Sequence, residues 1–403
     1  MMSPSLSPSI SHDHAPSQPP SGSSISAANR PLVLHARFAS PSAPDFGQQE
    51  RLKRRFTLVN IARDLLPDKR VAKCYRWTAG GMVEVLHHAE YMRASYGGLQ
   101  TCGSIHVCAM CGSKIAERRA QEIQQAVTRW TNTGGTVTLA TFTLQHDHTD
   151  GLAALGASLN EAYRRLHSGK AWQGFQEQFE IAGGITAREY TYGTHGWHPH
   201  LHALWFHRKP VARRKLHQME RWVQSAWKPA LKSFGRFAEL RIGATVRMGN
   251  EEIGHYVTKT GRAWTVGDEL AKANRKQSRS AGSRSIIQLL ADAGAGDELA
   301  GLRFTEYAEY TFARKALVWS KGLRSLVGVD EDEQTDEEIA GEQLAHGRLL
   351  VILDRGQWQV VLGNDSRAEL LLEAAEGEIS KVRSFLTLLG VQLESWQLGE
   401  SAE

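Results

Sequence analysis

The stretch His198-Pro199-His200-Leu201-His202, which continues into the apolar run Ala203-Leu204-Trp205-Phe206, decides how this chain folds. Successive side chains of a β-strand point to opposite faces, so the three histidines share one face while Pro199 and Leu201 point toward a core. The apolar run predicts that the strand continues into the interior. Three imidazoles spaced two residues apart favour a metal or phosphate site, and a histidine-rich surface strand is the alternative.

The segments around this strand predict an α+β fold with an antiparallel central sheet. Hydrophobic spacing predicts helices, and β-branched or alternating apolar runs predict strands. The predicted strands are residues 136–144, 179–192, 197–206 and 238–248, and the predicted helices are residues 151–168 and 211–232. The resulting β-α-β-β-α-β order is the split βαβ arrangement of ferredoxin-like folds.

The hairpin that contains the histidine strand can be placed in register. If residues 193–196 form the whole loop, Glu189 lies directly opposite His200, with Cβ atoms about 5 Å apart. In the predicted topology the first and third strands are central neighbours, so His146 also approaches the histidine strand. A carboxylate on the histidine face completes a set of two histidines and one carboxylate. That set suits Mg²⁺ or Mn²⁺ bound together with a substrate phosphate.

All four cysteines of the chain fall before the first strand of this domain. Three follow the pattern Cys102-x₅-Cys108-x₂-Cys111, whose last pair has zinc-knuckle spacing, and Cys74 can supply a fourth ligand. Two disulfides are not expected in a reducing cytosol. We therefore predict a structural Zn²⁺ site with four cysteine ligands, with scattered core thiols as the alternative.

Composition and charge point to a protein that binds nucleic acid. The chain has 403 residues, of which 41% are hydrophobic and 23% charged, as in soluble globular proteins. We expect a cytoplasmic location, because neither a signal peptide nor an apolar run long enough to cross a membrane is visible. Residues 327–403 carry 17 acidic and 5 basic side chains, a net −12, whereas the remainder carries +17. A basic body with an acidic tail is typical of nucleic-acid binders, although such charges can also simply be solvated.

A helix predicted after residue 250 carries a second reactive set. Asn250 is a good N-cap, and Glu252, Tyr256 and Lys259 then share one helix face. A tyrosine can attack phosphorus when a metal polarises the phosphate and a cation stabilises the phenolate. Glu252 could act later as a general base. The alternative is a packed aromatic ring beside an ordinary surface ion pair.

Three blocks of this sequence resemble the Rep rolling-circle replication initiators of small plasmids, in the HUH endonuclease superfamily. They are Thr-Phe-Thr-Leu-Gln-His at 141–146, Gly-Trp-His-Pro-His-Leu-His-Ala-Leu at 196–204, and Glu-x-x-x-Tyr-x-x-Lys at 252–259. The last block is similar to the single-tyrosine branch, which pairs the nucleophile with a glutamate. The resemblance covers about residues 100–262, and His255 replaces the usual lysine before the tyrosine.

The resemblance implies a site and a reaction. His200 and His202 would hold the metal, with Glu189 as third ligand and His146 as second choice for that role. Tyr256 would nick a single-stranded site in the plasmid origin, forming a 5′-phosphotyrosine and leaving a 3′-OH primer. Further implied roles are release of the strand by Glu252, phenolate stabilisation by Lys259, and DNA binding by Lys259 and Arg262. The implied partners are the origin DNA, a host helicase and polymerase, and a second copy of the chain.

Other protein classes fit parts of the sequence. The run 198–204 also matches the histidine-triad nucleotide hydrolases, but that class leaves the Glu–Tyr–Lys helix unexplained. A zinc-dependent DNA-binding repressor explains the cysteines and the basic body, but not the histidine strand. A transposase or a conjugative relaxase would share the chemistry, although the former usually has a second tyrosine and the latter places its tyrosine near the N-terminus.

We predict five regions along the chain. They are a disordered arm (1–48), a basic helical segment with the cysteines (49–131), the nicking domain (132–265), a helical accessory region (266–327), and an acidic linker with a small C-terminal domain (328–403). Within the last two regions we expect a helix over residues 304–323, a hairpin over 349–362 and a single helix over 367–389.

Overall fold

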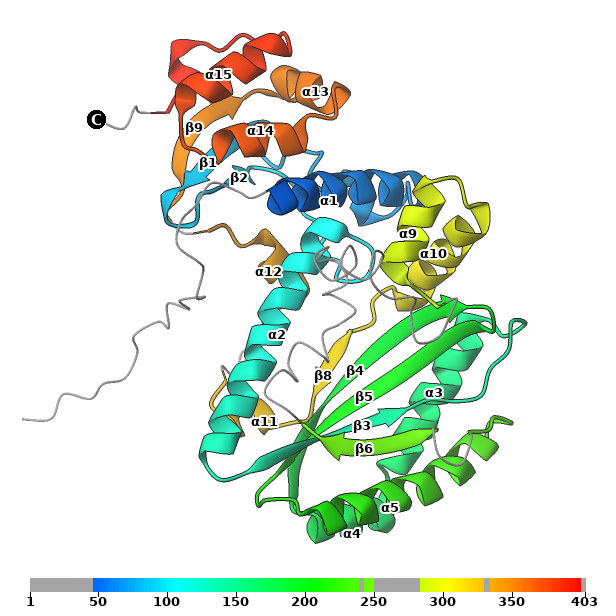
Figure 1. Ribbon diagram of the computed structural model, residues 1–403. Helices are drawn as coiled ribbons and strands as arrows, with labels where there is room; N and C mark the ends of the chain where they lie inside the picture. The colour runs from blue at the N-terminus through cyan, green and yellow to red at the C-terminus, as the bar shows by residue number, and fades with distance from the viewer. Residues whose placement is uncertain (1–45, 239–242, 250–282, 330–333, 345, 400–403) are drawn as a thin grey trace, which may run out of the picture. The chain divides into compact units, whose positions relative to one another are not determined.

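The histidine motif lies on β5, a central strand of an antiparallel sheet with ferredoxin-like strand order. The structure is a computed structural model that describes residues 46–238, 243–249, 283–329, 334–344 and 346–399 (Figure 1). The order across the sheet is β6-β3-β5-β4-β7, and β8 also pairs with β4. Along the chain the elements β3, α3, β4, β5, α5 and β6 follow one another, with the additional helix α4 before β4. The predicted α+β fold with a βαββαβ core and an antiparallel sheet is therefore confirmed.

The strands of this sheet are β3 (Thr136–Phe142), β4 (Ile181–Gly193), β5 (Gly196–His207), β6 (Ala244–Met248), β7 (Arg284–Ser285) and β8 (Leu317–Trp319). The helices that follow the chain around it are α2 (Ala109–Asn132), α3 (Leu152–Leu166), α4 (Gly169–Gln178), α5 (Arg213–Lys232), α9 (Ile286–Gly294), α10 (Glu298–Thr311) and α11 (Leu323–Leu326).

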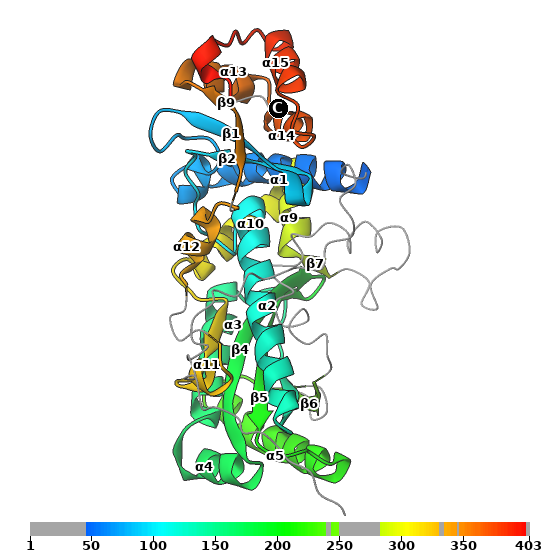
Figure 2. The same cartoon turned by 90° about the vertical axis from the view of Figure 1, so that its left-hand side faces the viewer.

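The two faces of the sheet are covered by different helices, and this determines where the histidines are accessible. Helices α3, α4 and α5 pack on the face that carries Phe142, Leu201 and Trp205. Helix α2 packs on the opposite face, against Leu204 and Phe206 (Figure 2). Because alternate residues of β5 share a face, the histidines continue the strip that α2 covers. His198 and His200 are only half-buried there, so this end of the face is open to ligands.

A second sheet joins segments from both halves of the chain. It consists of β1 (Val83–His88), β2 (Arg93–Gly97) and β9 (Arg348–Leu353), in the order β2-β1-β9. Its buried residues form a core with the helices of the C-terminal segment and with Phe56 of the first helix. The C-terminal segment therefore shares a core with residues 83–97 and is not packed by itself. The helices involved are α1 (Phe46–Leu65), α12 (Asp336–Gly341), α13 (Arg355–Gly363), α14 (Arg367–Ala374) and α15 (Ile379–Leu388), and the 3₁₀ turns are η1 (Arg70–Lys73), η2 (Ala89–Tyr91) and η3 (Ser395–Gln397).

Three predictions for the C-terminal half are wrong. Residues 349–362 form a strand followed by a helix, because Asp354 and Gln357 make a capping box that starts α13. The helix predicted over 367–389 is divided, and Gly377 in the connection has a φ of 80°, which glycine adopts readily. The helix predicted over 304–323 ends at Thr311, and the chain then returns along β4 as β8.

Candidate functional site

The hairpin β4–β5 has the register predicted from its loop. Gly193 pairs with Gly196, and Glu189 pairs with His200. Gly196 has a φ of 86° and lies so close to the backbone of Asp147 that a Cβ atom there would be 2.7 Å from its carbonyl oxygen. Glycine is thus required for both the conformation and the space. This tight turn fixes which β4 side chains face the histidines.

His202 is held between two side chains from the neighbouring strands. It is 3% exposed, and its Nδ1 atom lies 3.1 Å from Thr141 Oγ1 on β3. Its Nε2 atom lies 3.0 Å from Glu189 Oε2 on β4. A carboxylate only accepts hydrogen bonds, so this approach requires a proton on one of the two atoms or a cation bound to both of them. The Thr141 hydroxyl can donate to Nδ1 or accept from it, so it fits both states of the ring.

The geometry of Glu189 and His202 fits a divalent cation. Ligand atoms of Mg²⁺ lie about 2.1 Å from the ion in octahedral geometry, so adjacent ligand atoms are about 3 Å apart. The 3.0 Å between Glu189 Oε2 and His202 Nε2 agrees with this spacing. The ring of His200 is nearly parallel to that of His202, with an interplanar angle of 10° and 6.1 Å between centroids. Among the described residues, only the four cysteines form a group of three or more with ligand atoms within 4.8 Å of one another, so an Mg²⁺ or Mn²⁺ site made by His200, His202 and Glu189 stays a prediction.

His198 and His146 form a neighbouring pair on the same side of the hairpin. Their ring centroids are 4.7 Å apart, and His146 Nδ1 lies 3.0 Å from the carbonyl oxygen of His195. His198 Nε2 lies 3.1 Å from Thr143 Oγ1. Burial, followed by the charges of His200 and His146, lowers the pKa of His198 to about 3, so its ring is neutral at physiological pH. Of the two candidates for the third metal ligand, Glu189 is therefore the one in contact with His202, and His146 is in contact with His198.

The other predicted catalytic residues lie outside the described residues. This applies to Glu252, Tyr256, Lys259 and Arg262.

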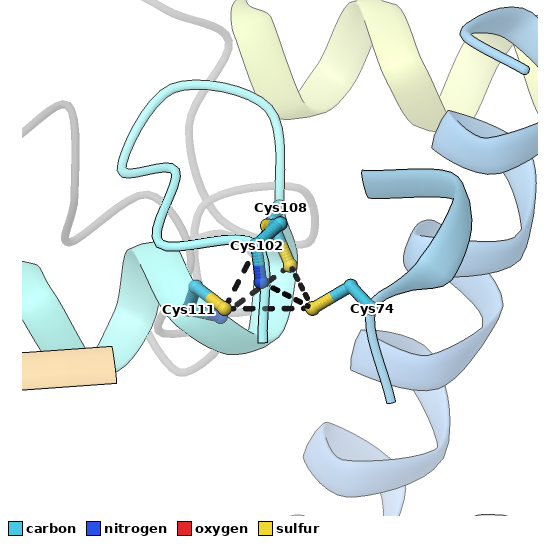
Figure 3. A group of neighbouring side chains, drawn as sticks. All are labelled: Cys74, Cys102, Cys108 and Cys111. Atoms are coloured by element: carbon cyan, nitrogen blue, oxygen red, sulfur yellow. Dashed lines mark hydrogen bonds between the residues drawn. The ribbon is translucent and has the colours of Figure 1, made fainter. Parts of the chain in front are cut away.

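The four cysteines form one buried cluster (Figure 3). Their sulfur atoms lie within 4.8 Å of one another, and the Cys74 Sγ atom is 3.6 Å from Cys108 and 3.5 Å from Cys111. Zinc bonds of about 2.3 Å in tetrahedral geometry place sulfur atoms about 3.8 Å apart, close to these distances. Cys108 is also the N-cap of α2 and accepts a hydrogen bond from Cys111 N.

The chemistry of this cluster agrees with a metal such as zinc. Burial raises the pKa of the Cys108 thiol well above its ordinary range. Four buried thiolates can exist together only when a cation compensates their charge. The predicted group of four cysteines that could bind zinc is therefore confirmed as a cluster.

The sequence interpretation missed Thr141 as a partner of the metal ligands. Its hydroxyl reaches His202 because Thr141 and His202 are paired residues of β3 and β5. The topology predicts that these two strands are neighbours, but a register between them could not be derived because no tight turn joins them. By contrast, the 193–196 loop fixed the position of Glu189.

Comparison with known proteins gives two relatives. One is "Protein rep" of Streptomyces lividans, which is 29% identical in an alignment that covers 60% of this chain and 67% of the relative. The other is "Neomycin resistance protein" of Streptomyces cyanogenus, which is 34% identical over 27% of this chain and only 30% of the relative. No family model and no solved structure matches the chain. These similarities support the prediction of a plasmid Rep-type protein, and the HUH branch stays a prediction.

Within the described ranges, no helix is a candidate for crossing a membrane. None of the helices there is both long enough and apolar enough to cross a bilayer.

Proposed function

We propose that this protein initiates rolling-circle replication of a plasmid by nicking one strand of the origin. The observation that carries the proposal is the approach of Glu189 to His202, with His200 beside them, at the open end of a ferredoxin-like sheet. His200, His202 and Glu189 would hold the cation, and the cation would bind a scissile phosphate at the half-buried end of the strand. The similarity to a protein named Protein rep supports the same class of function.

In this proposal His200, His202 and Glu189 hold Mg²⁺ or Mn²⁺. The ion, when bound, withdraws charge from the phosphate oxygens and stabilises the charge that builds up during substitution at phosphorus. Thr141 fixes the orientation of the His202 ring, and Glu189 supplies negative charge that favours cation binding.

The proposed nucleophile is Tyr256. Its phenolic oxygen attacks the phosphorus, and the new P–O bond forms as the bond to the 3′ oxygen breaks. The phenolic proton is lost to a base, and the departing 3′ oxygen takes up a proton to become a 3′-OH. The number of phosphoester bonds is unchanged, so the step needs neither oxidant nor reductant. Lys259 would stabilise the phenolate, with Arg262 on the DNA backbone.

Release would use a different residue. Glu252 would accept a proton from water or from a terminal hydroxyl, which then attacks the phosphotyrosine and frees Tyr256. The 3′-OH left by the first step would prime a host polymerase, with a host helicase opening the duplex. The origin DNA is the partner that the basic body of the chain would bind.

The test incubates the purified protein with supercoiled plasmid carrying its own origin, with Mg²⁺ or Mn²⁺. We expect a nicked circle with protein attached to the 5′ end. Tyr256→Phe should abolish this adduct, whereas Tyr91→Phe, on η2, should not. Nicking that survives Tyr256→Phe would assign the nucleophile elsewhere. Origin binding without nicking in either metal would contradict the nickase and favour a DNA-binding repressor.

A further inference from the structure

A cavity of about 480 Å³ lies between the cysteine loop and the end of α10. Its volume falls in the range of pockets that bind small organic ligands. Apolar side chains form much of its wall, including Leu66, Val71, Ile105 and Leu317. Cys102 of the cysteine cluster also lines the cavity, whereas His198, His200, His202 and Glu189 do not.

The rim of this cavity combines basic side chains with an exposed aromatic ring. Phe312 follows the last residue of α10 and is 68% exposed. The Lys69 ammonium lies 5.1 Å from the centre of its ring. Arg314 and Lys315 are exposed on the next turn of chain and also line the cavity. An exposed phenylalanine surrounded by cations is suited to a ligand that has both a flat ring and a negative charge.

The acidic side chains of the lining already have basic partners. Glu337 forms an ion pair of 2.7 Å with Arg70, and Asp336 forms one of 3.1 Å with Arg119. Their charges are thus compensated, and Lys69 and Arg314 add positive charge at the rim. The Arg314 guanidinium lies over the ring of Tyr310, which holds it near the cavity.

The cavity lies close to the histidine site. Leu317, in its wall, pairs with Ala187 of β4, and Ala187 pairs with His202 of β5. Residues paired across neighbouring strands point to the same face, so Leu317 and His202 share a face of the sheet. Two strand spacings, about 10 Å, separate their backbones. A single strand of DNA with a phosphate at the histidines could reach the cavity with a nearby nucleotide.

We propose that this cavity binds a base of single-stranded DNA next to the scissile phosphate. Phe312 stacks on the base, and Lys69 and Arg314 contact the adjoining phosphates. Base pairs in a duplex are stacked inside the helix, so only an unpaired base can enter. The cavity thereby selects the single-stranded form of the site. This inference rests on the proposed function, because it takes single-stranded DNA as the substrate.

The test measures binding of fluorescein-labelled oligo(dT) of 20 nucleotides by anisotropy. The background is full-length Tyr256→Phe protein without added divalent ion, so that nicking cannot interfere. We expect Phe312→Ala to weaken binding about 10-fold, since stacking of one base contributes this order of affinity. Lys69→Ala should lower the slope of log K against log salt by about 0.7, the value for one phosphate contact on a single strand.

Two control variants match these changes. Leu302→Ala removes a side chain on α10 that is equally exposed, at 68%, and Lys170→Ala removes an exposed lysine on α4. Both should bind oligo(dT) as the background protein does, and a 20-base-pair duplex should bind to all variants within about twofold. Equal affinities for Phe312→Ala and Leu302→Ala would overturn the proposal. This test measures binding and not nicking. Its outcome therefore does not depend on whether the protein nicks its origin.

Discussion

Thr141 and His202 are paired residues of the two central strands, and the Thr141 hydroxyl lies 3.1 Å from the Nδ1 atom of His202. This contact leaves the Nε2 atom of His202 directed at Glu189. A histidine that binds a metal through Nε2 carries its proton on Nδ1 and needs an acceptor there. Thr141 can supply that acceptor.

We therefore predict that Thr141→Val weakens Mn²⁺ binding at the histidine site by about 10- to 100-fold, the usual effect of removing such a partner. Calorimetric titration of the Tyr256→Phe protein would measure this without any nicking. Thr141→Ser should restore most of the affinity because it keeps the hydroxyl.

Thr143→Val is the matched control for this prediction. It removes the same group one residue after the end of β3, but the Thr143 hydroxyl contacts His198 rather than His202. Its Mn²⁺ affinity should stay within about threefold of the parent protein. If both valine variants lost affinity equally, Thr141 would have no specific part in orienting His202.

The second prediction concerns the cysteine cluster, which joins the residue after η1, the loop after β2 and the start of α2. The protein as purified should contain one zinc per chain, measured by elemental mass spectrometry. Cys108→Ser should lower this content and reduce the free energy of unfolding by on the order of 5 kcal/mol, because zinc binding contributes to folding. Serine can still cap α2 at this position, so the loss should reflect the missing zinc ligand and not a missing N-cap. A full zinc content in Cys108→Ser, or wild-type stability without zinc, would contradict a structural zinc site.

The third prediction is a loss of stability in acid that depends on His167. Its ring lies between those of Tyr163 and Trp172, with centroids 3.9 Å from each, and burial lowers its pKa to about 4. In the unfolded chain a histidine has a pKa near 6.5, so between about pH 6.5 and pH 4 the unfolded state binds more protons. The free energy of unfolding should therefore fall by up to about 3 kcal/mol as the pH decreases through this range.

Urea unfolding at several pH values would measure this contribution. His167→Phe keeps an aromatic ring in place but cannot be protonated, so its free energy of unfolding should change less between pH 7 and pH 4 than that of the parent protein. A pH dependence identical to that of the parent protein would show that another group is responsible.

The sequence predicts the sheet around the histidines well, because its signals there are local. The loop 193–196 fixes the hairpin register by itself, so the pairing of Glu189 with His200 could be derived without a structure. The ferredoxin-like order then makes β3 the neighbour of β5. The four cysteines were also predictable as a set, since three of them have the spacing of a metal-binding turn.

The second sheet could not be predicted because its pairing joins distant parts of the chain. Val83 on β1 pairs with Leu353 on β9. The local sequence of β9 does not indicate that it pairs with β1, since an apolar strand can pair with the edge of many sheets. The capping box at Asp354 is a local signal, and it favours a helix start over the predicted hairpin. The rim of the cavity also required the structure, because Lys69 and Phe312 come together only in the fold.

The last prediction tests whether the C-terminal segment stabilises the hairpin formed by β1 and β2. Leu350 on β9 is fully buried in the core shared with β1, whereas Leu388 at the end of α15 is 86% exposed. Leu350→Ala should lower the free energy of unfolding by about 2–5 kcal/mol, as is usual for a buried leucine, and Leu388→Ala by less than about 0.5 kcal/mol. Because β1 bonds to β9, the amides of β1 should also exchange faster in Leu350→Ala. Unchanged exchange in β1, together with lost protection in α13 to α15, would instead mean that the C-terminal segment unfolds independently of the hairpin.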